Sequence, residues 1–157
     1  MKPKLGISEK HLNKVIELLM SLLADEFILY TKTRKFHWNV SGNSFIELHV
    51  LFQKQYQELE ASVDLMAERV NKLGGIAIGT LKEFLALTRL SESPSKHLTQ
   101  KEMITQLLND HETIIIQLRS DIEECIGKNN DAGTGDFLTG IMEQHETTSW
   151  VLRRYLG

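Results

Sequence analysis

The sequence FHWNVSGNSFIELHVLFQKQYQELEASVDLMAERV, residues 36–70, decides how this 157-residue chain is organised. Its polar residues are spaced like metal ligands and unlike a solvated helix face. His37 closes one helical pattern, and His49 and Gln53 lie four residues apart on the next. Asp64 and Glu68 lie four residues apart further along the same pattern. Residues at i and i+4 share a helix face, so each pair is predicted to point at one site.

The two pairs cannot meet within one chain. His49 and Asp64 are 15 residues apart, which is roughly 22 Å at about 1.5 Å per residue, whereas a metal–ligand bond is about 2 Å long. Yet Gln53 and Asp64 differ by only roughly 20° around the helix axis. Two antiparallel copies related by a two-fold axis near residues 58–59 would place the first pair opposite the second pair of the partner. Because such a dimer makes every contact twice, we predict two intersubunit metal sites.

Apolar residues at three- and four-residue steps predict four long amphipathic helices, with a short helix between the second and third. Potential capping boxes open three of these segments, at Ser44 with Glu47, Thr80 with Glu83, and Thr99 with Glu102. The expected segments run from the cap Ser8 to about Trp38, from Ser44 to residues 74–75, over residues 81–88, from Thr99 to residues 127–130, and from about Asp131 to Tyr155.

The predicted fold class is therefore all-α, a four-helix bundle with a short helix in the long crossover between helices two and three. A crossover of about 25 residues allows those two helices to run parallel. No strand-like alternation, repeat or linker competes with this reading. We expect one domain over residues 1–157, with a short N-terminal tail over residues 1–7.

Composition narrows the class of protein. Hydrophobic residues make up 41% and charged residues 25% of the chain, an ordinary balance for a soluble domain. The net charge of −3 gives no bulk attraction to nucleic acid. Cys125 is the only cysteine, so no disulfide can form within a chain. With no signal-peptide pattern and no membrane-length apolar run, we expect a cytoplasmic protein without a membrane partner.

Three motifs together carry a resemblance: HWN at residues 37–39, the spacing of Phe45, His49 and Asp64, and MAER at residues 66–69. With them the chain resembles the Dps family (DNA-binding proteins from starved cells), the miniature ferritins, over nearly its whole length. The resemblance implies a ferritin-like bundle assembled into a dodecameric shell built from two-fold dimers. It also implies that the shell binds ferrous iron, oxidises it, typically with hydrogen peroxide, and stores ferric mineral, which protects against oxidative damage.

By this resemblance the ferroxidase ligands are His37 and His49 from one subunit and Asp64 and Glu68 from its mate. Gln53 departs from the pattern, because the family usually has a carboxylate there. An amide can lend its carbonyl oxygen to a metal but no charge, so we expect weaker binding, particularly of a second iron. Zinc would also accept this ligand set and is expected as a competing ion.

Other residues leave alternatives open. The resemblance implies acidic pores lined by Asp131 and Asp136, but these residues equally fit a helix cap and a favourable charge in the first helical turn. Trp38 fits either a place near the iron or the core. The phenylalanines are expected in the core. The remaining histidines are expected to lie on the surface or to be satisfied within helices: His11, His97, His111 and His145.

The sequence is compatible with three functions. The first is a ferroxidase and iron store. The second is a DNA-coating nucleoid protein, for which the few N-terminal cations, Lys2 and Lys4, predict weak or absent binding. The third is a shell whose metal site is weakened by Gln53. A conventional ferritin is disfavoured because the chain has no Glu-x-x-His motif for an intrasubunit di-iron site.

Overall fold

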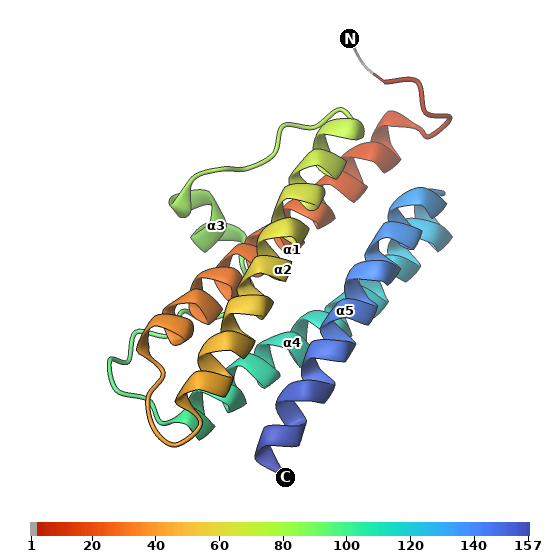
Figure 1. Ribbon diagram of the computed structural model, residues 1–157. Helices are drawn as coiled ribbons and strands as arrows, with labels where there is room; N and C mark the ends of the chain where they lie inside the picture. Colours follow the sequence, from red (N-terminus) through yellow and green to blue (C-terminus); the bar gives the residue numbers. More distant parts are fainter. Residues whose placement is uncertain (1–2) are drawn as a thin grey trace.

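The computed structural model describes residues 3–157, which form four long helices and one short helix (Figure 1). No strand occurs within this range, and the all-α prediction is confirmed. The helices are α1 (Glu9–Asn39), α2 (Phe45–Lys72), α3 (Leu81–Leu87), α4 (Gln100–Glu123) and α5 (Ala132–Leu156), and a π-helical turn η1 (Glu124–Lys128) continues α4.

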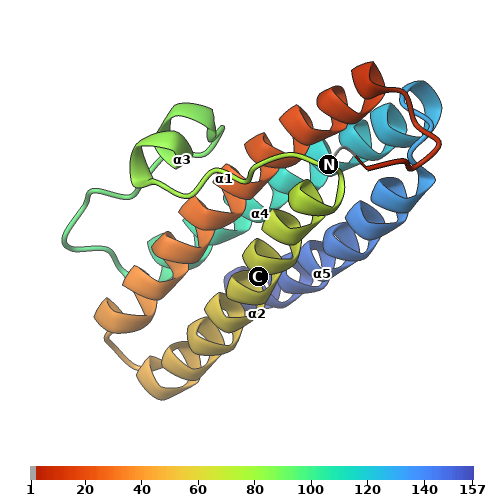
Figure 2. The same cartoon turned by 90° about the horizontal axis from the view of Figure 1, so that it is seen from above.

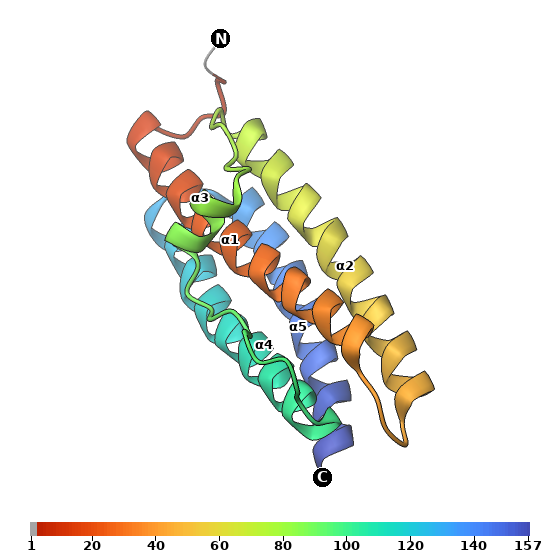
Figure 3. The same cartoon turned by 90° about the vertical axis from the view of Figure 1, so that its left-hand side faces the viewer.

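The long helices pack as two pairs, α1 with α2 and α4 with α5, which face each other across the core (Figures 1 and 3). The segment between α2 and α4 runs back along the length of the bundle (Figure 3). As a result α2 and α4 point in the same direction, as the long crossover predicts. The short helix α3 lies against the outer side of α1 (Figure 2).

Side-chain caps fix most of the helix starts. Thr80 and Thr99 form the predicted capping boxes, in which each threonine hydroxyl accepts a hydrogen bond from the backbone N–H three residues on. Hydrogen bonds from the backbone and side chain of Thr99 lower the pKa of Glu102. The box predicted at Ser44 is wrong. Its φ of −98° and ψ of 30° lie outside the extended region, and its side chain makes no capping bond.

Backbone reversals end the helices near the predicted positions. Gly74 has a φ of +92° directly after α2, a conformation that glycine adopts without a steric penalty. Asn130 has a φ of +54° after η1, and asparagine tolerates this left-handed region better than most residues. The π-helical turn itself was not predicted.

The core consists of apolar side chains from all four long helices. Phe36, Phe52 and Met66 are at most 1% exposed, and Phe84 of α3 is buried in a stack against Phe27 of α1, with ring centroids 4.1 Å apart. Phe45 is an exception to the expectation that phenylalanines are core residues, because it is 40% exposed. No helix within residues 3–157 combines the length and apolarity needed to cross a bilayer.

Candidate metal centre

His37 and His49 lie side by side where α1 ends and α2 begins. The five-residue loop between the two helices turns the chain back, so that the last turn of α1 faces the first turns of α2. The imidazole rings stack with centroids 3.8 Å apart and an interplanar angle of 23°. His37 is 8% exposed and His49 is half-buried. The structure therefore brings together the two predicted imidazole ligands.

Each histidine is held by the backbone of the other. His37 Nδ1 lies 2.8 Å from the carbonyl oxygen of His49, and His49 Nδ1 lies 2.9 Å from the carbonyl oxygen of His37. A carbonyl oxygen can only accept, so both rings must donate from Nδ1. In the neutral rings, both Nε2 atoms then keep their lone pairs, as metal ligands must.

The acidic pair occupies a distant part of α2. Asp64 and Glu68 are both exposed, and Glu68 forms an ion pair with Lys72 at 2.9 Å. Because α2 is one uninterrupted helix, Asp64 stays roughly 22 Å along the axis from His49. The protomer thus does not bring the two predicted pairs together. Across the described residues 3–157, no three His, Cys, Asp or Glu side chains gather closely enough to hold a metal ion.

Trp38 directly follows His37 in the sequence, and Gln53 follows His49 by four positions. Gln53 is half-buried on α2, one turn after His49. Trp38 is 67% exposed, so it is not a core residue of the protomer. The guanidinium of Arg34 lies 5.6 Å from the centroid of the Trp38 ring system, a distance that permits a cation–π contact.

Asp131 and Asp136 have different surroundings. Asp131 is buried and caps α5, accepting hydrogen bonds from the backbone N–H and the hydroxyl of Thr134, and it pairs with Arg69 at 3.2 Å. The capping alternative is therefore confirmed. Asp136 is exposed and is the fifth residue of α5, just beyond the first turn where it was expected. Only Asp136 of the two presents its side chain to solvent.

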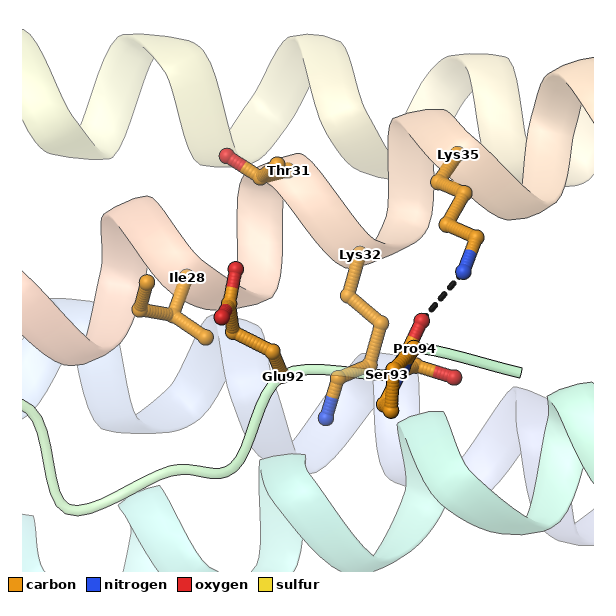
Figure 4. A pocket seen from close by; sticks show the side chains of 7 residues that line it. All are labelled: Ile28, Thr31, Lys32, Lys35, Glu92, Ser93 and Pro94. Atoms are coloured by element: carbon orange, nitrogen blue, oxygen red, sulfur yellow. Dashed lines mark hydrogen bonds between the residues drawn. The ribbon is translucent and has the colours of Figure 1, made fainter. Parts of the chain in front are cut away.

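A cavity of about 250 Å³ lies between α1 and the crossover (Figure 4). Two lysines line it, and both already have partners. Lys35 donates to the carbonyl oxygens of Ser93 and Ser95, while Lys32 pairs with Asp110 at 2.5 Å. These ammonium groups tie the crossover and α4 to α1, so the two lysines have a structural role.

Sequence reasoning missed a buried polar chain inside the bundle. Glu26, His145 and His111 come from α1, α5 and α4 and are at most 2% exposed. Burial, followed by the neighbouring His145, lowers the pKa of His111 well below its usual value. The sequence did carry a signal that these side chains face the core. Glu26 lies three and four residues after Leu23 and Leu22, and His111 lies three and four residues after Leu108 and Leu107, so each shares a helix face with apolar residues. Of the four remaining histidines, His97 is exposed, His11 is half-buried and His145 has both ring nitrogens hydrogen-bonded, which matches the expectation. His111 does not match it, because its buried Nε2 has no hydrogen-bond partner in the described part of the chain.

The chain is similar in sequence to a known protein family and to several known proteins. A family model described as a ferritin-like domain matches residues 16–157. An uncharacterised low-temperature-induced protein of Nostoc sp. is 40% identical over 152 residues, which cover 97% of this chain and 85% of that protein. The DNA protection during starvation protein 2 of Bacillus anthracis is 35% identical, over 92% of this chain and 97% of the relative.

Solved structures share the fold. The Dps protein of Vibrio cholerae O1 superposes with a TM-score of 0.93 at 25% identity, covering 100% of this chain and 98% of the other. It is described as a member of a broad superfamily of ferritin-like diiron-carboxylate proteins. Together with the family match, this agreement confirms the predicted ferritin-like bundle.

Proposed function

This chain belongs to the Dps family of ferritin-like proteins, and on that premise we propose that it is a ferroxidase and iron-storage shell protein that protects against oxidative damage. The observation that carries this proposal is the reciprocal locking of His37 and His49. It leaves two imidazole Nε2 atoms free to bind a metal, one from the last turn of α1 and one from α2, the helix that also carries the two carboxylates. Ferrous iron accepts this mixture of nitrogen and oxygen ligands.

The proposed site lies across a two-fold interface. His37, His49 and Gln53 of one subunit face Asp64 and Glu68 of its partner, and the symmetry repeats the arrangement. The exposed apolar side chains of α2 support this packing, since large apolar side chains left on a protomer surface are typical of an interface. They are Phe45, Ile46, Val50 and Leu65.

In the proposed reaction iron is the substrate and the side chains hold it. The carboxylates of Asp64 and Glu68 attract the cation and balance its charge, while His37 and His49 bind it through Nε2. Each ferrous ion gives up one electron. One hydrogen peroxide molecule takes two electrons and breaks its O–O bond to give two hydroxides, so charge and atoms balance. Gln53 supplies a neutral oxygen, so a second iron is expected to bind to the site more weakly than the first.

Assembly and location are part of the same proposal. We propose a dodecamer built from the two-fold dimers and located in the cytoplasm, with residues 1–157 as one domain. Asp136, whose side chain is exposed, is the better candidate for an acidic pore that draws cations inward. Asp131 already serves as the cap of α5.

DNA coating is the less favoured function. The chain carries a net charge of −3, and non-specific DNA binding depends on neutralising several phosphates. Of the two N-terminal lysines singled out in the sequence, Lys4 is exposed, and Lys2 lies outside the described residues. We therefore propose weak or absent DNA binding, although relatives carry a name that refers to DNA protection.

Subunit complementation tests the shared site. His49→Ala and Asp64→Ala each disable every site when expressed alone. In a randomly mixed shell about half of the dimers pair the two variants, and one of the two sites in each such dimer keeps all its ligands. About a quarter of all sites are then intact. Co-expressed variants should recover about a quarter of the wild-type rate of ferric absorbance growth with peroxide.

The control mixes the two variants after each has assembled separately, without subunit exchange, and should show no recovery. If the co-expressed shells also show none, although mass spectrometry confirms mixed subunits, the intersubunit site is wrong. If either variant alone retains the wild-type rate, iron oxidation does not depend on these ligands.

A further inference from the structure

A small cavity lies inside the bundle, between α2, α4 and α5. Its volume is about 10 Å³, which suits one particle of the size of a water molecule. The lining side chains are Gln55, Glu58, Leu59, His111, Gln144, His145 and Thr148. All of these except Leu59 carry side-chain nitrogen or oxygen atoms, and none belongs to the proposed intersubunit site.

Hydrogen bonds behind the cavity fix the orientation of His111. Glu26 Oε1 lies 2.6 Å from His145 Nε2, and His145 Nδ1 lies 2.7 Å from His111 Nδ1. The carboxylate accepts from His145 Nε2–H, so the Nδ1 atom of a neutral His145 is an acceptor. His111 must then donate from Nδ1 and keep a lone pair on Nε2. That assignment follows from the hydrogen-bond network.

Two buried acceptor atoms belong to side chains that line the cavity. His111 Nε2 and Gln55 Oε1 have no hydrogen-bond partner within the described part of the chain. His111 is 2% exposed and Gln55 is 4% exposed, so bulk water does not satisfy these atoms. A buried acceptor without a donor costs free energy, which favours a positively charged or donating occupant.

We propose that this cavity is an intrasubunit binding site for one divalent transition-metal ion, with His111 Nε2 and Gln55 Oε1 as ligands and Glu58 and Gln144 completing the set. The chain from Glu26 through His145 to His111 is one imidazole longer than the carboxylate–histidine–metal arrangements that orient ligating imidazoles in proteins.

Charge also favours a cation. Glu26 is completely buried, and within residues 3–157 the basic group that it contacts is the imidazole of His145, which carries no charge in the neutral form. A buried carboxylate without a firm positive partner is costly. Glu58 adds a carboxylate to the lining of the cavity. Its side chain is 38% exposed, and the ammonium group of Lys54 lies 3.7 Å away.

The ligand chemistry selects the class of metal. One imidazole nitrogen, two amide oxygens and one carboxylate suit a borderline divalent ion such as Co²⁺ or Zn²⁺ better than Ca²⁺ or Mg²⁺, which favour oxygen ligands alone. Gln53 and Gln55 differ by about 200° around α2. The internal site and the intersubunit site therefore use opposite faces of this helix.

Cobalt binding to the assembled protein tests this proposal. The background variant carries His49→Gln, Asp64→Asn and Glu68→Gln, which replaces three of the five side chains of the proposed intersubunit site and both of its carboxylates without changing their size greatly. Equilibrium dialysis with Co²⁺ should then give about one ion per subunit, with visible d–d absorption bands of a nitrogen- and oxygen-ligated ion. Anomalous scattering from cobalt-soaked crystals should place the ion beside His111.

Single substitutions in that background separate ligands from bystanders. Glu58→Gln should weaken Co²⁺ affinity by about tenfold or more, whereas Glu47→Gln, the same charge change at an exposed position of α2, should leave it unchanged. Glu26→Gln should weaken affinity by roughly 10–100-fold. Because Glu26 positions His111 and does not touch the ion, the d–d bands should keep their wavelengths.

Two results would overturn the inference. One is the absence of Co²⁺ binding to the background variant, which would leave Glu26, His145 and His111 as a hydrogen-bond network only. The other is Co²⁺ binding that neither Glu58→Gln nor Gln55→Leu weakens, with cobalt located elsewhere in the crystals. Because Glu58 is partly exposed, its substitution does not depend on repacking the core.

Discussion

The carboxylate of Asp25 in α1 binds both the backbone and the side chain of Arg89 in the crossover. One carboxylate oxygen accepts from the Arg89 backbone N–H at 2.6 Å, and the other accepts from the guanidinium Nε at 2.7 Å. Thr88 adds a hydroxyl donor at 2.9 Å. Asp25 is 1% exposed, so this clamp fixes the end of the α3 segment against the bundle.

Replacing Asp25 should therefore destabilise the crossover. Asp25→Ala leaves the guanidinium of Arg89 with only the more distant carboxylate of Asp121, at 3.8 Å. We expect a loss of about 3 kcal/mol, the lower end of the range for breaking a buried ion pair, because Arg89 is partly exposed and keeps this second partner. Chemical denaturation measures the loss, and hydrogen exchange should show faster opening of residues 81–90. Glu92→Ala, at an exposed crossover position, is the control. Equal stability of both variants would contradict this role.

His49→Ala should slow iron oxidation by at least about tenfold while leaving the assembly intact. The substitution removes one Nε2 ligand, but the carbonyl oxygen that accepts from His37 belongs to the backbone and remains. The substitution thus removes one ligand and the ring stacked on His37, but it keeps the hydrogen bond that orients His37. Stopped-flow absorbance of ferric products measures the rate, with His97→Ala, an exposed histidine, as the control. An unchanged rate would remove His49 from the site.

Gln53→Asp should strengthen iron binding, most clearly for a second ion. The change replaces a neutral amide oxygen by a charged carboxylate at the same position of α2, and ferrous iron favours carboxylate oxygen. We expect about tenfold tighter binding, equivalent to about 1.4 kcal/mol, in anaerobic calorimetric titrations. Gln57→Asp, at an exposed position of the same helix, adds the same charge as a control. Equal gains in both variants would indicate a general charge effect.

Cys125 should be inert in the folded protein. Burial, with smaller effects from Asp131, Asp121 and Glu124, raises the pKa of its thiol to about 12. A raised pKa lowers the thiolate fraction, and the thiolate is the reactive form. Thiol reagents should leave the native protein unlabelled between pH 7 and about pH 9, and denaturant should expose one reactive thiol per chain. Rapid native labelling at pH 8 would contradict the burial of this side chain.

DNA should not be retarded by this protein in gels, even at low salt. The net charge of −3 gives the chain no bulk attraction to phosphates, and non-specific affinity falls further as salt rises. The measurement is an electrophoretic mobility assay with linear duplex DNA in about 50 mM salt. A basic DNA-binding protein serves as the positive control. Clear retardation would show a cationic surface that net charge does not reveal.

Much of the local structure could be predicted because it depends on neighbouring residues. The caps at Ser8, Thr80 and Thr99 are formed by side chains that reach backbone N–H groups three residues away. The failure at Ser44 has a similarly local cause, because the tight loop before α2 sets a backbone conformation that keeps its hydroxyl from the cap position.

The sequence by itself determined the four helices, the stops between them and the i, i+4 pairs on α2, because helix geometry fixes which neighbours share a face. Only tertiary structure decided which distant side chains meet. Glu26 and His145 are separated by 119 positions yet lie in hydrogen-bond contact, and helix periodicity says only that each faces inward. Their contact depends on how the helices are rotated and shifted against one another, and so do the reciprocal hydrogen bonds of His37 and His49. The packing of the whole core sets these rotations and shifts.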